Sequence, residues 1–164
     1  MPSFCGKVVL ITGASSGIGA ATARHFAGLN CAGLEGLGVD KVVTVVADVT
    51  DEADRCKVLH AVNSNYGRLD VLINNAGIAP RQCSAQCGSL EVFDAIFDTN
   101  VRSVVAMTQL MLPLLKTSNG SIVTVSSFAG LRPAHYVTFY SMSKSAIDQL
   151  QNVLQWSWPV MASA

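Results

Sequence analysis

"KVVLITGASSGIG", Lys7 to Gly19, is the stretch that decides the fold class of this chain. Lys7–Ile11 reads as a buried strand and leads directly into a turn with glycines at 13, 17 and 19. The alanine-rich residues Gly17–Ala27 then predict a helix. This order is typical of a dinucleotide site, where helix N-terminal amides face a pyrophosphate. The turn alone is a weak signal, because any tight strand-to-helix turn favours glycine.

The rest of the chain repeats the alternation of strand and helix. Apolar runs at Val42–Ala47, Val71–Ile73 and Ile122–Val125 alternate with predicted helices at Asp51–Tyr66, Glu91–Leu115 and Tyr140–Trp156. Continuous apolar runs are expected where both faces of a parallel sheet are covered. The sequence therefore predicts an α/β fold, a Rossmann-like doubly wound parallel sheet, with these runs and Lys7–Ile11 as its strands.

Local signals refine the predicted helices. Thr50 is the expected N-cap of the helix at Asp51–Tyr66. The helix at Glu91–Leu115 is expected to break near Asp98–Asn100, and Pro159 is expected to end the last helix. One segment does not fit the alternation, since Leu29–Lys41 contains three glycines and no credible strand.

Composition limits the classes of function. The 164 residues are enough for one domain, residues 1–164, and 11 basic against 11 acidic residues give a formal net charge of zero. This balance gives no reason to expect nucleic acid or an acidic membrane surface as a partner. No apolar run is long enough to predict a membrane span, and no leader peptide is apparent. Five scattered cysteines predict reduced thiols in an intracellular, cytoplasmic protein, and their spacing predicts no metal site.

Two polar loops follow predicted strands. Asp48 lies in "ADVTD" after the run Val42–Ala47, and Asn74 lies in "NNAG" after Val71–Ile73. The carboxyl ends of parallel strands meet at one edge, so both loops are expected beside the glycine turn. Local turn chemistry is the alternative explanation for both side chains.

A tyrosine and a lysine lie one helical turn apart. Tyr140 and Lys144 are i and i+4 in "YSMSK", so their side chains share a helix face. A phenol with a pKa of about 10 is a poor base at neutral pH, and a nearby ammonium lowers that value. The pair could act as a general acid and base, although an amphipathic helix explains the spacing of either residue alone.

Two further polar residues support a chemical site. Ser127 ends the run "GSIVTVSS", and its hydroxyl could hydrogen-bond a carbonyl substrate. Asn100 lies at the predicted break of the long helix, where a polar side chain turned inward is a plausible use of an asparagine.

"TGASSGIG", "NNAG", "DTNVRS", "SIVTVSS" and "YSMSK", in this order, closely resemble the short-chain dehydrogenase/reductase family. The resemblance implies hydride transfer between NAD or NADP and an alcohol or carbonyl substrate. The implied catalytic residues are Asn100, Ser127, Tyr140 and Lys144. The implied cofactor-binding residues are Gly13, Ser15, Gly17, Ile18, Gly19, Asp48, Val49, Asn75, Ala76, Tyr140 and Lys144.

By the same resemblance, the second strand and helix of the family and its C-terminal substrate region are missing. Glu35 and Asp40 do not replace the strand-end residue that selects between NAD and NADP, so that choice stays open. Three hypotheses follow: an active oxidoreductase, a non-catalytic truncated variant that pairs with full-length members, and a chain that does not fold stably. The helices at 98–116 and 139–156 are the expected interface of a homo- or hetero-oligomer.

Overall fold

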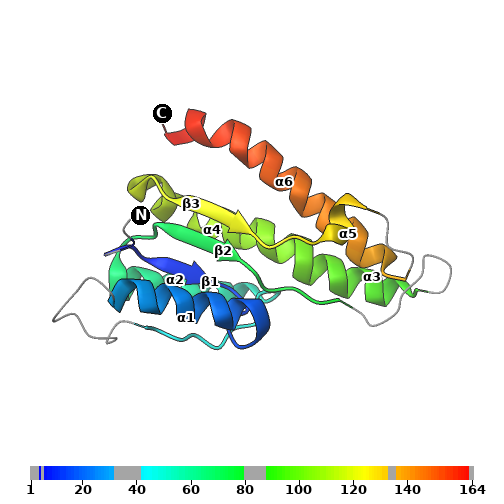
Figure 1. The fold of residues 1–164 in the computed structure, drawn as a ribbon, viewed down its shortest axis with the longest axis horizontal. Helices are drawn as coiled ribbons and strands as arrows, with labels where there is room; N and C mark the ends of the chain where they lie inside the picture. The colour runs from blue at the N-terminus through cyan, green and yellow to red at the C-terminus, as the bar shows by residue number, and fades with distance from the viewer. Residues whose placement is uncertain (1–3, 5, 32–41, 80–87, 133–135, 163–164) are drawn as a thin grey trace.

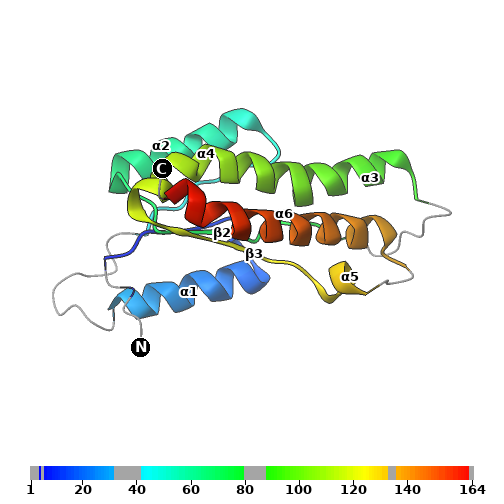
Figure 2. The same cartoon turned by 90° about the horizontal axis from the view of Figure 1, so that it is seen from above.

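The structure, a computed structural model, describes residues 4, 6–31, 42–79, 88–132 and 136–162. Within these residues, three parallel strands form one sheet in the order β1-β2-β3: β1 (Val9–Ile11), β2 (Val71–Asn74) and β3 (Ser121–Thr124). Helix α1 (Gly17–Cys31) lies on one face of the sheet, and α2 (Glu52–Tyr66) and α4 (Ser103–Ser118) lie on the other (Figures 1 and 2). The predicted Rossmann-like doubly wound α/β fold is therefore confirmed.

The predicted break in the long helix is also confirmed. Helix α3 (Leu90–Phe97) continues through a π-helical segment (Asp98–Arg102) into α4. The short helix α5 (Phe128–Leu131) packs against α6 (Thr138–Ala162), which runs beside β3. The prediction that Pro159 ends this helix is wrong. A proline costs a helix one hydrogen bond without having to end it, as Pro113 inside α4 also shows.

The start of α2 differs from the prediction by one residue. Asp51, and not Thr50, is the N-cap, because its carboxylate accepts a hydrogen bond from the amide of Asp54 at 2.8 Å. At the other end, Gly67 adopts a left-handed conformation (φ +64°) and its amide donates to the carbonyl of Asn63.

The main core lies between the sheet and the helices α2 and α4. Buried residues recur at every fourth position along these helices, which places them on one face of each. Seven residues form this core: Val58, Val62, Leu69, Leu72, Met107, Met111 and Leu115. Among the described residues, no helix is long and apolar enough to cross a membrane.

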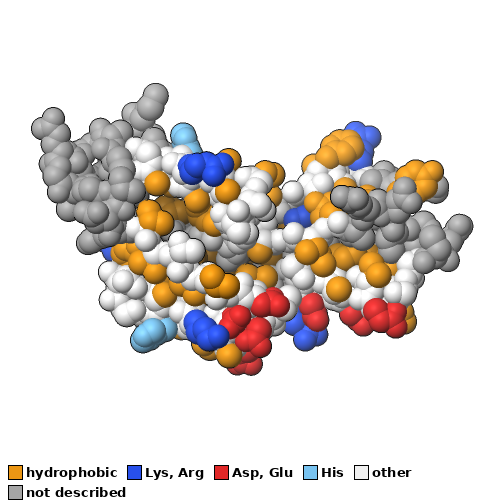
Figure 3. All heavy atoms as spheres, turned by 90° about the horizontal axis from the view of Figure 1, so that it is seen from below, with side chains coloured by type: hydrophobic (Ala, Val, Ile, Leu, Met, Phe, Trp, Pro, Cys, Tyr) orange, Lys and Arg blue, Asp and Glu red, His pale blue; other side chains and the backbone are white. Residues whose placement is uncertain are grey.

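The predicted strand at Val42–Ala47 is wrong. This segment is extended, but none of its described residues pairs with a strand of the sheet. Val45 and Ala47 pack against the core, whereas Val46 is 94% exposed, so only one side of the run is covered. The segment follows the lower side of the molecule in Figure 1, as the cyan trace before α2. Seen from that side, hydrophobic side chains are spread over the surface and acidic ones gather along one edge (Figure 3).

Part of the predicted Leu29–Lys41 irregularity, residues 32–41, lies outside the described residues, as do Glu35 and Asp40. The last strand, β3, is covered on one face only, since Val123 is 47% exposed. Beside it, Gln151 of α6 accepts a hydrogen bond from Thr124 Oγ1 at 3.1 Å, which fastens the helix to this strand.

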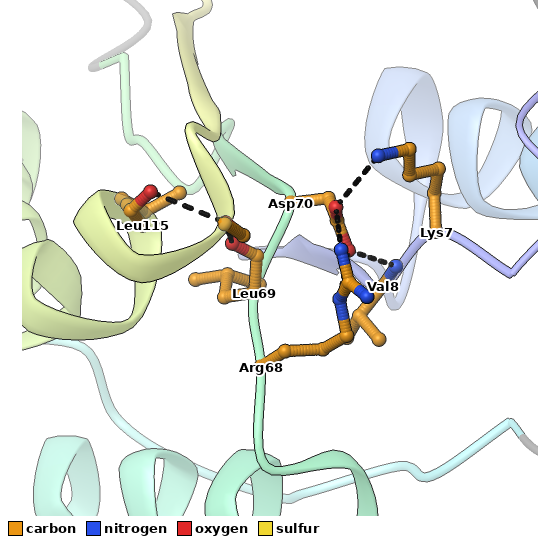
Figure 4. Close-up of polar contacts among 7 residues, drawn as sticks. Lys7, Val8, Arg68, Leu69, Asp70 and Leu115 are labelled. Carbon is orange, nitrogen blue, oxygen red and sulfur yellow. Dashed lines mark hydrogen bonds and ion pairs between the residues drawn. The ribbon is translucent and has the colours of Figure 1, made fainter. Parts of the chain in front are cut away.

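A buried carboxylate joins the strands at their amino ends. Asp70, which directly precedes β2, is 5% exposed and accepts hydrogen bonds from Lys7 Nζ, the Val8 amide and the Arg68 guanidinium (Figure 4). Its backbone carbonyl accepts from the Ser121 amide at 2.8 Å, at the start of β3. One residue therefore fixes the register at the start of all three strands.

The surroundings of Asp70 set its titration. Burial raises the pKa of Asp70, but the hydrogen bonds from Arg68, Val8 and Lys7 outweigh burial and hold the pKa below its ordinary value of 3.8. A carboxyl whose folded-state pKa is depressed stabilises the protein above its unfolded-state pKa. That contribution is lost as the pH falls through the folded-state value.

Asp70→Asn is therefore expected to lower the free energy of unfolding at pH 7 by about 1.5–3 kcal/mol. Urea unfolding of both proteins between pH 7 and pH 3 checks this. The difference between them should narrow as the pH falls below 3.8. Asp98→Asn, which removes an exposed ion pair with Arg102, is the matched control and should change little. A loss that is equal for both variants, or independent of pH, would contradict this role for Asp70.

Candidate active site

The glycine turn leaves the beginning of α1 open. Gly13 and Gly17 have left-handed φ angles of +65° and +53°, which favour glycine. A Cβ atom placed on Gly17 would meet nothing within 4 Å, and Ile18 is 67% exposed. The first amides of a helix have no intrahelical partner, so this open end of α1 can receive an anionic group. Ser15 lies in the same exposed turn.

Gly19 also allows close packing of the backbone. A Cβ atom on Gly19 would collide with the carbonyl oxygen of Gly13 and with Nδ2 of Asn75. A Cβ atom on Gly13 would lie 2.8 Å from the Cα atom of Ala76. The first turn of α1, the glycine turn and the loop after β2 are therefore in close backbone contact.

Thr12 holds this contact together, a role that was not predicted from the sequence. Its hydroxyl oxygen accepts hydrogen bonds from the amides of Asn75 and Ala76, both at 3.0 Å. The Asn75 side chain returns two bonds from Nδ2, to the carbonyls of Thr12 at 2.9 Å and Gly13 at 3.1 Å. Asn75 and Ala76 thus lie at the glycine turn as predicted, and the side chain of Asn75 holds the turn in shape. The feature of the sequence that indicates this role is a threonine directly after an apolar strand.

Gly19→Ala is expected to lower the free energy of unfolding by about 1–3 kcal/mol, because the added methyl group has no space. Gly28→Ala, in the same helix, should raise it by about 0.5–1 kcal/mol, since nothing lies within 4 Å of the added atom. Thermal or urea unfolding measures both. Equal effects of the two substitutions would contradict the close packing at Gly19.

The loop Asp48–Thr50 is held in shape by hydrogen bonds within the loop. Asp48 Oδ1 accepts from the amide and the hydroxyl of Thr50, at 2.8 and 2.7 Å. The bonds from Thr50 hold the pKa of Asp48 below its ordinary value. Val49 packs against the core and its carbonyl accepts from Arg55 at 2.7 Å. The local turn chemistry considered for Asp48 is present, and contact of Asp48 or Val49 with a ligand stays a prediction.

Asn74 and Asn75 have different roles although they are neighbours. Asn74 is 3% exposed, and its Nδ2 donates to Thr108 Oγ1 of α4 at 3.2 Å, which ties the end of β2 to that helix. Local turn chemistry does not describe Asn74, because its partner lies 34 residues away.

Asn100 connects three segments. It is 1% exposed within the π-helical segment, as expected for an asparagine turned inward. Its Oδ1 accepts from the Ile78 amide at 2.8 Å, and its Nδ2 donates to the Ile78 carbonyl at 2.9 Å and to Ser143 Oγ of α6 at 3.1 Å. Ser143 in turn donates to the Tyr140 carbonyl at 2.7 Å. The side chain of Asn100 therefore joins the loop after β2 to the helix that carries Tyr140.

Lys144 is buried beside Tyr140. Its side chain reaches back along α6 to donate to the Val125 carbonyl at 2.7 Å, and its Nζ lies 5.6 Å from the centroid of the Tyr140 ring. Burial lowers the pKa of Lys144, and the charge of Asp148 opposes this effect. The phenol and the ammonium thus lie on one face of the helix, as predicted, and the structure adds that Lys144 is buried.

Ser127 is held at the beginning of α5. Its Oγ accepts from the Ala129 amide at 3.2 Å and so caps that helix. A hydroxyl has one proton to donate and two lone pairs, so this capping leaves its proton available for another oxygen. Ser145 Oγ of α6 donates to the Gly130 carbonyl at 2.7 Å, which fixes α5 against the helix of Tyr140.

The loop Asn75–Ile78 brings the two parts of the site together. Asn75 holds the glycine turn, and Ile78 is bonded to Asn100. Between them, a Cβ atom placed on Gly77 would lie 3.2 Å from Asn100 Oδ1 and 3.7 Å from Lys144 Nζ. The open end of α1 and the Tyr140–Lys144 face therefore both lie against this loop, beyond the carboxyl end of β2.

Comparison with known proteins identifies the family. The chain matches the model of the short chain dehydrogenases over residues 7–159, and it belongs to that family. It is 38% identical over 158 residues to 11-beta-hydroxysteroid dehydrogenase 1A of Arabidopsis thaliana, covering 87% of this chain and 45% of that protein. It is 39% identical over 158 residues to the 3-oxoacyl-acyl-carrier-protein reductase FabG of Thermotoga maritima, covering 87% and 64%. This chain thus spans less than two thirds of the length of either relative.

Solved structures agree with this assignment. The KRED1-Pglu enzyme superimposes with a TM-score of 0.86 at 26% identity, over 93% of this chain and 70% of that one. A short-chain dehydrogenase/reductase of Caenorhabditis elegans, solved with its cofactor, also gives 0.86, at 28% identity and over 98% and 68%. NAD or NADP is the cofactor of this family.

Proposed function

We propose that this chain is an NAD- or NADP-dependent oxidoreductase that interconverts an alcohol and a carbonyl compound. The observation that supports this most is the loop Asn75–Ile78, which contacts both the glycine turn and the surroundings of Lys144. A dinucleotide is long, and its pyrophosphate and nicotinamide must be held at two places on one edge. The two halves of this edge would serve those two places.

The residues present fit such a cofactor. The space that a side chain at position 17 would occupy is open, because Gly17 has none and a Cβ atom placed there would meet nothing within 4 Å. The backbone amides beside it, at the start of α1, suit a pyrophosphate. Gly13, Ser15, Ile18 and Gly19 would complete that end of the site. Asp48, Val49, Asn75 and Ala76 would lie along the adenosine half, and Tyr140 and Lys144 would hold the nicotinamide ribose. When bound, the nicotinamide supplies or accepts the hydride.

The side chains on α6 and α5 would manage the proton. In carbonyl reduction, the Tyr140 hydroxyl would pass its proton to the substrate oxygen, and in alcohol oxidation it would take that proton back. Ser127 would donate its free hydroxyl proton to the same oxygen and so orient the substrate. Lys144, anchored on the Val125 carbonyl, would hold its ammonium near the phenol. Asn100 would keep the π-helical segment and α6 in register and hold a water molecule of the proton relay.

Tyr140→Phe is expected to lower turnover of a panel of ketones and alcohols by about 10²–10⁴-fold, because the proton donor is lost. Cofactor affinity should change little. The measurement is NADH or NADPH absorbance at 340 nm, a known property of the reduced nicotinamide. Tyr66→Phe, at the end of α2, is the control and should keep its activity. Unchanged turnover in Tyr140→Phe would contradict the assignment, as would a cofactor-binding chain without turnover on any substrate.

We also propose that the chain associates with a second copy or with a longer family member through α4 and α6. Met142 and Val153, on α6, are 46% and 55% exposed, so this helix offers a partner apolar side chains to cover. Light scattering of the purified chain, alone and after mixing with a longer family member, tests this proposal. A monomer under both conditions would contradict it.

A further inference from the structure

The turn of α6 that follows Lys144 carries a carboxylate that no step described above uses. One oxygen of Asp148, Oδ2, is shielded from solvent and accepts no hydrogen bond from any described residue. A desolvated acceptor without a partner is costly, so it requires an explanation in terms of the site around it.

The position of this carboxylate relates it to Lys144. Side chains on an α-helix lean toward its N-terminus, so Asp148 lies over the turn that begins with Lys144. Gly130 of α5 packs against both residues. A Cβ atom on Gly130 would collide with Asp148 Oδ2 and lie 3.2 Å from Lys144 Cβ. The backbone of α5 therefore covers the carboxylate, and the bond from Ser145 to the Gly130 carbonyl holds that cover in place.

Few other groups in the described part of the chain could stabilise a positive charge at the Lys144 ammonium. Its neighbours are the Val125 carbonyl at the end of β3, the Tyr140 ring on α6 and the backbone of Gly77 after β2. Asn100 lies beside Gly77 and is neutral. Among the described residues, Asp148 is the charged group whose field acts on Lys144. One of its oxygens is shielded from water, and charges interact more strongly where water is absent.

From this arrangement we infer that Asp148 is a positioning residue of the active site, which keeps the buried Lys144 protonated beside Tyr140. The inference rests on the proposed function for its catalytic meaning, but not for its test. The carboxylate is covered by Gly130 and lies close to Lys144. Its negative charge offsets the loss of hydration that burial imposes on the ammonium. Without it, Lys144 would lose its proton at a lower pH, and its field on the Tyr140 phenol would disappear with it.

The test is a direct titration of the Lys144 ammonium by NMR, with ¹³C at the lysine Cε positions of the whole chain. Asp148→Asn should lower the pKa of Lys144, because the negative charge that opposes the effect of burial is removed. Asp148→Glu keeps a carboxylate on the same turn and should restore most of the difference. Asp98→Asn removes an acidic charge in the π-helical segment and should leave the pKa of Lys144 unchanged.

This titration needs neither cofactor nor turnover, so its failure is distinct from failure of the proposed function. If Asp148→Asn does not fold, Asp148→Ser provides the same charge removal in a smaller side chain. An unchanged Lys144 pKa in either folded variant would overturn the inference, as would an equal drop in Asp98→Asn. In a chain with Tyr140-dependent turnover, Asp148→Asn should also move the alkaline limb of the pH profile to lower pH by the same shift.

Discussion

The backbone of four residues, Asn75–Ile78, carries the contacts on which the rest of the candidate site depends. At one end, Asn75 and Ala76 are bonded to Thr12 and hold the glycine turn. At the other end, Ile78 is bonded in both directions to the side chain of Asn100. Because so short a segment cannot stretch, the open end of α1 and the Tyr140–Lys144 face of α6 are held at a fixed separation. A ligand that reaches across both parts would find them already in place.

The two ends of the sheet differ in how well their buried polar groups are satisfied. At the amino ends of the strands, both oxygens of the Asp70 carboxylate accept hydrogen bonds, and Asp70 fixes the register of the sheet. At the carboxyl ends, polar groups are kept in less favourable surroundings. Lys144 is desolvated, and one oxygen of Asp148 has no hydrogen-bond partner among the described residues. Such groups cost stability, and they are typical of functional sites.

Much of the fold follows from local sequence signals, and the differences have physical causes. The strands at β1, β2 and β3 and the break at Asp98–Asn100 are predicted because apolar runs and a poorly placed asparagine are local features. Val42–Ala47 has the composition of a strand, yet a strand also needs a neighbouring strand to pair with. In the part of the chain that the structure describes, no strand pairs with this segment, and local sequence does not reveal that. Likewise, the links from Asn75 to Thr12 and from Asn100 to Ser143 span 63 and 43 residues, and no spacing rule predicts them. The roles of Asp70 and Asp148 were not predicted either, because they depend on the residues that bury these carboxylates.

The central claim is that this chain holds a nicotinamide dinucleotide across the edge that Asn75–Ile78 organises. Thermal unfolding of the purified chain, with and without millimolar NADH or NADPH, tests it most directly. A ligand that binds only the folded state stabilises it by about 2.7 kcal/mol at a hundredfold excess over its dissociation constant. We expect one cooperative transition whose midpoint rises with at least one of the two cofactors. A cooperative transition that neither cofactor shifts would contradict the claim.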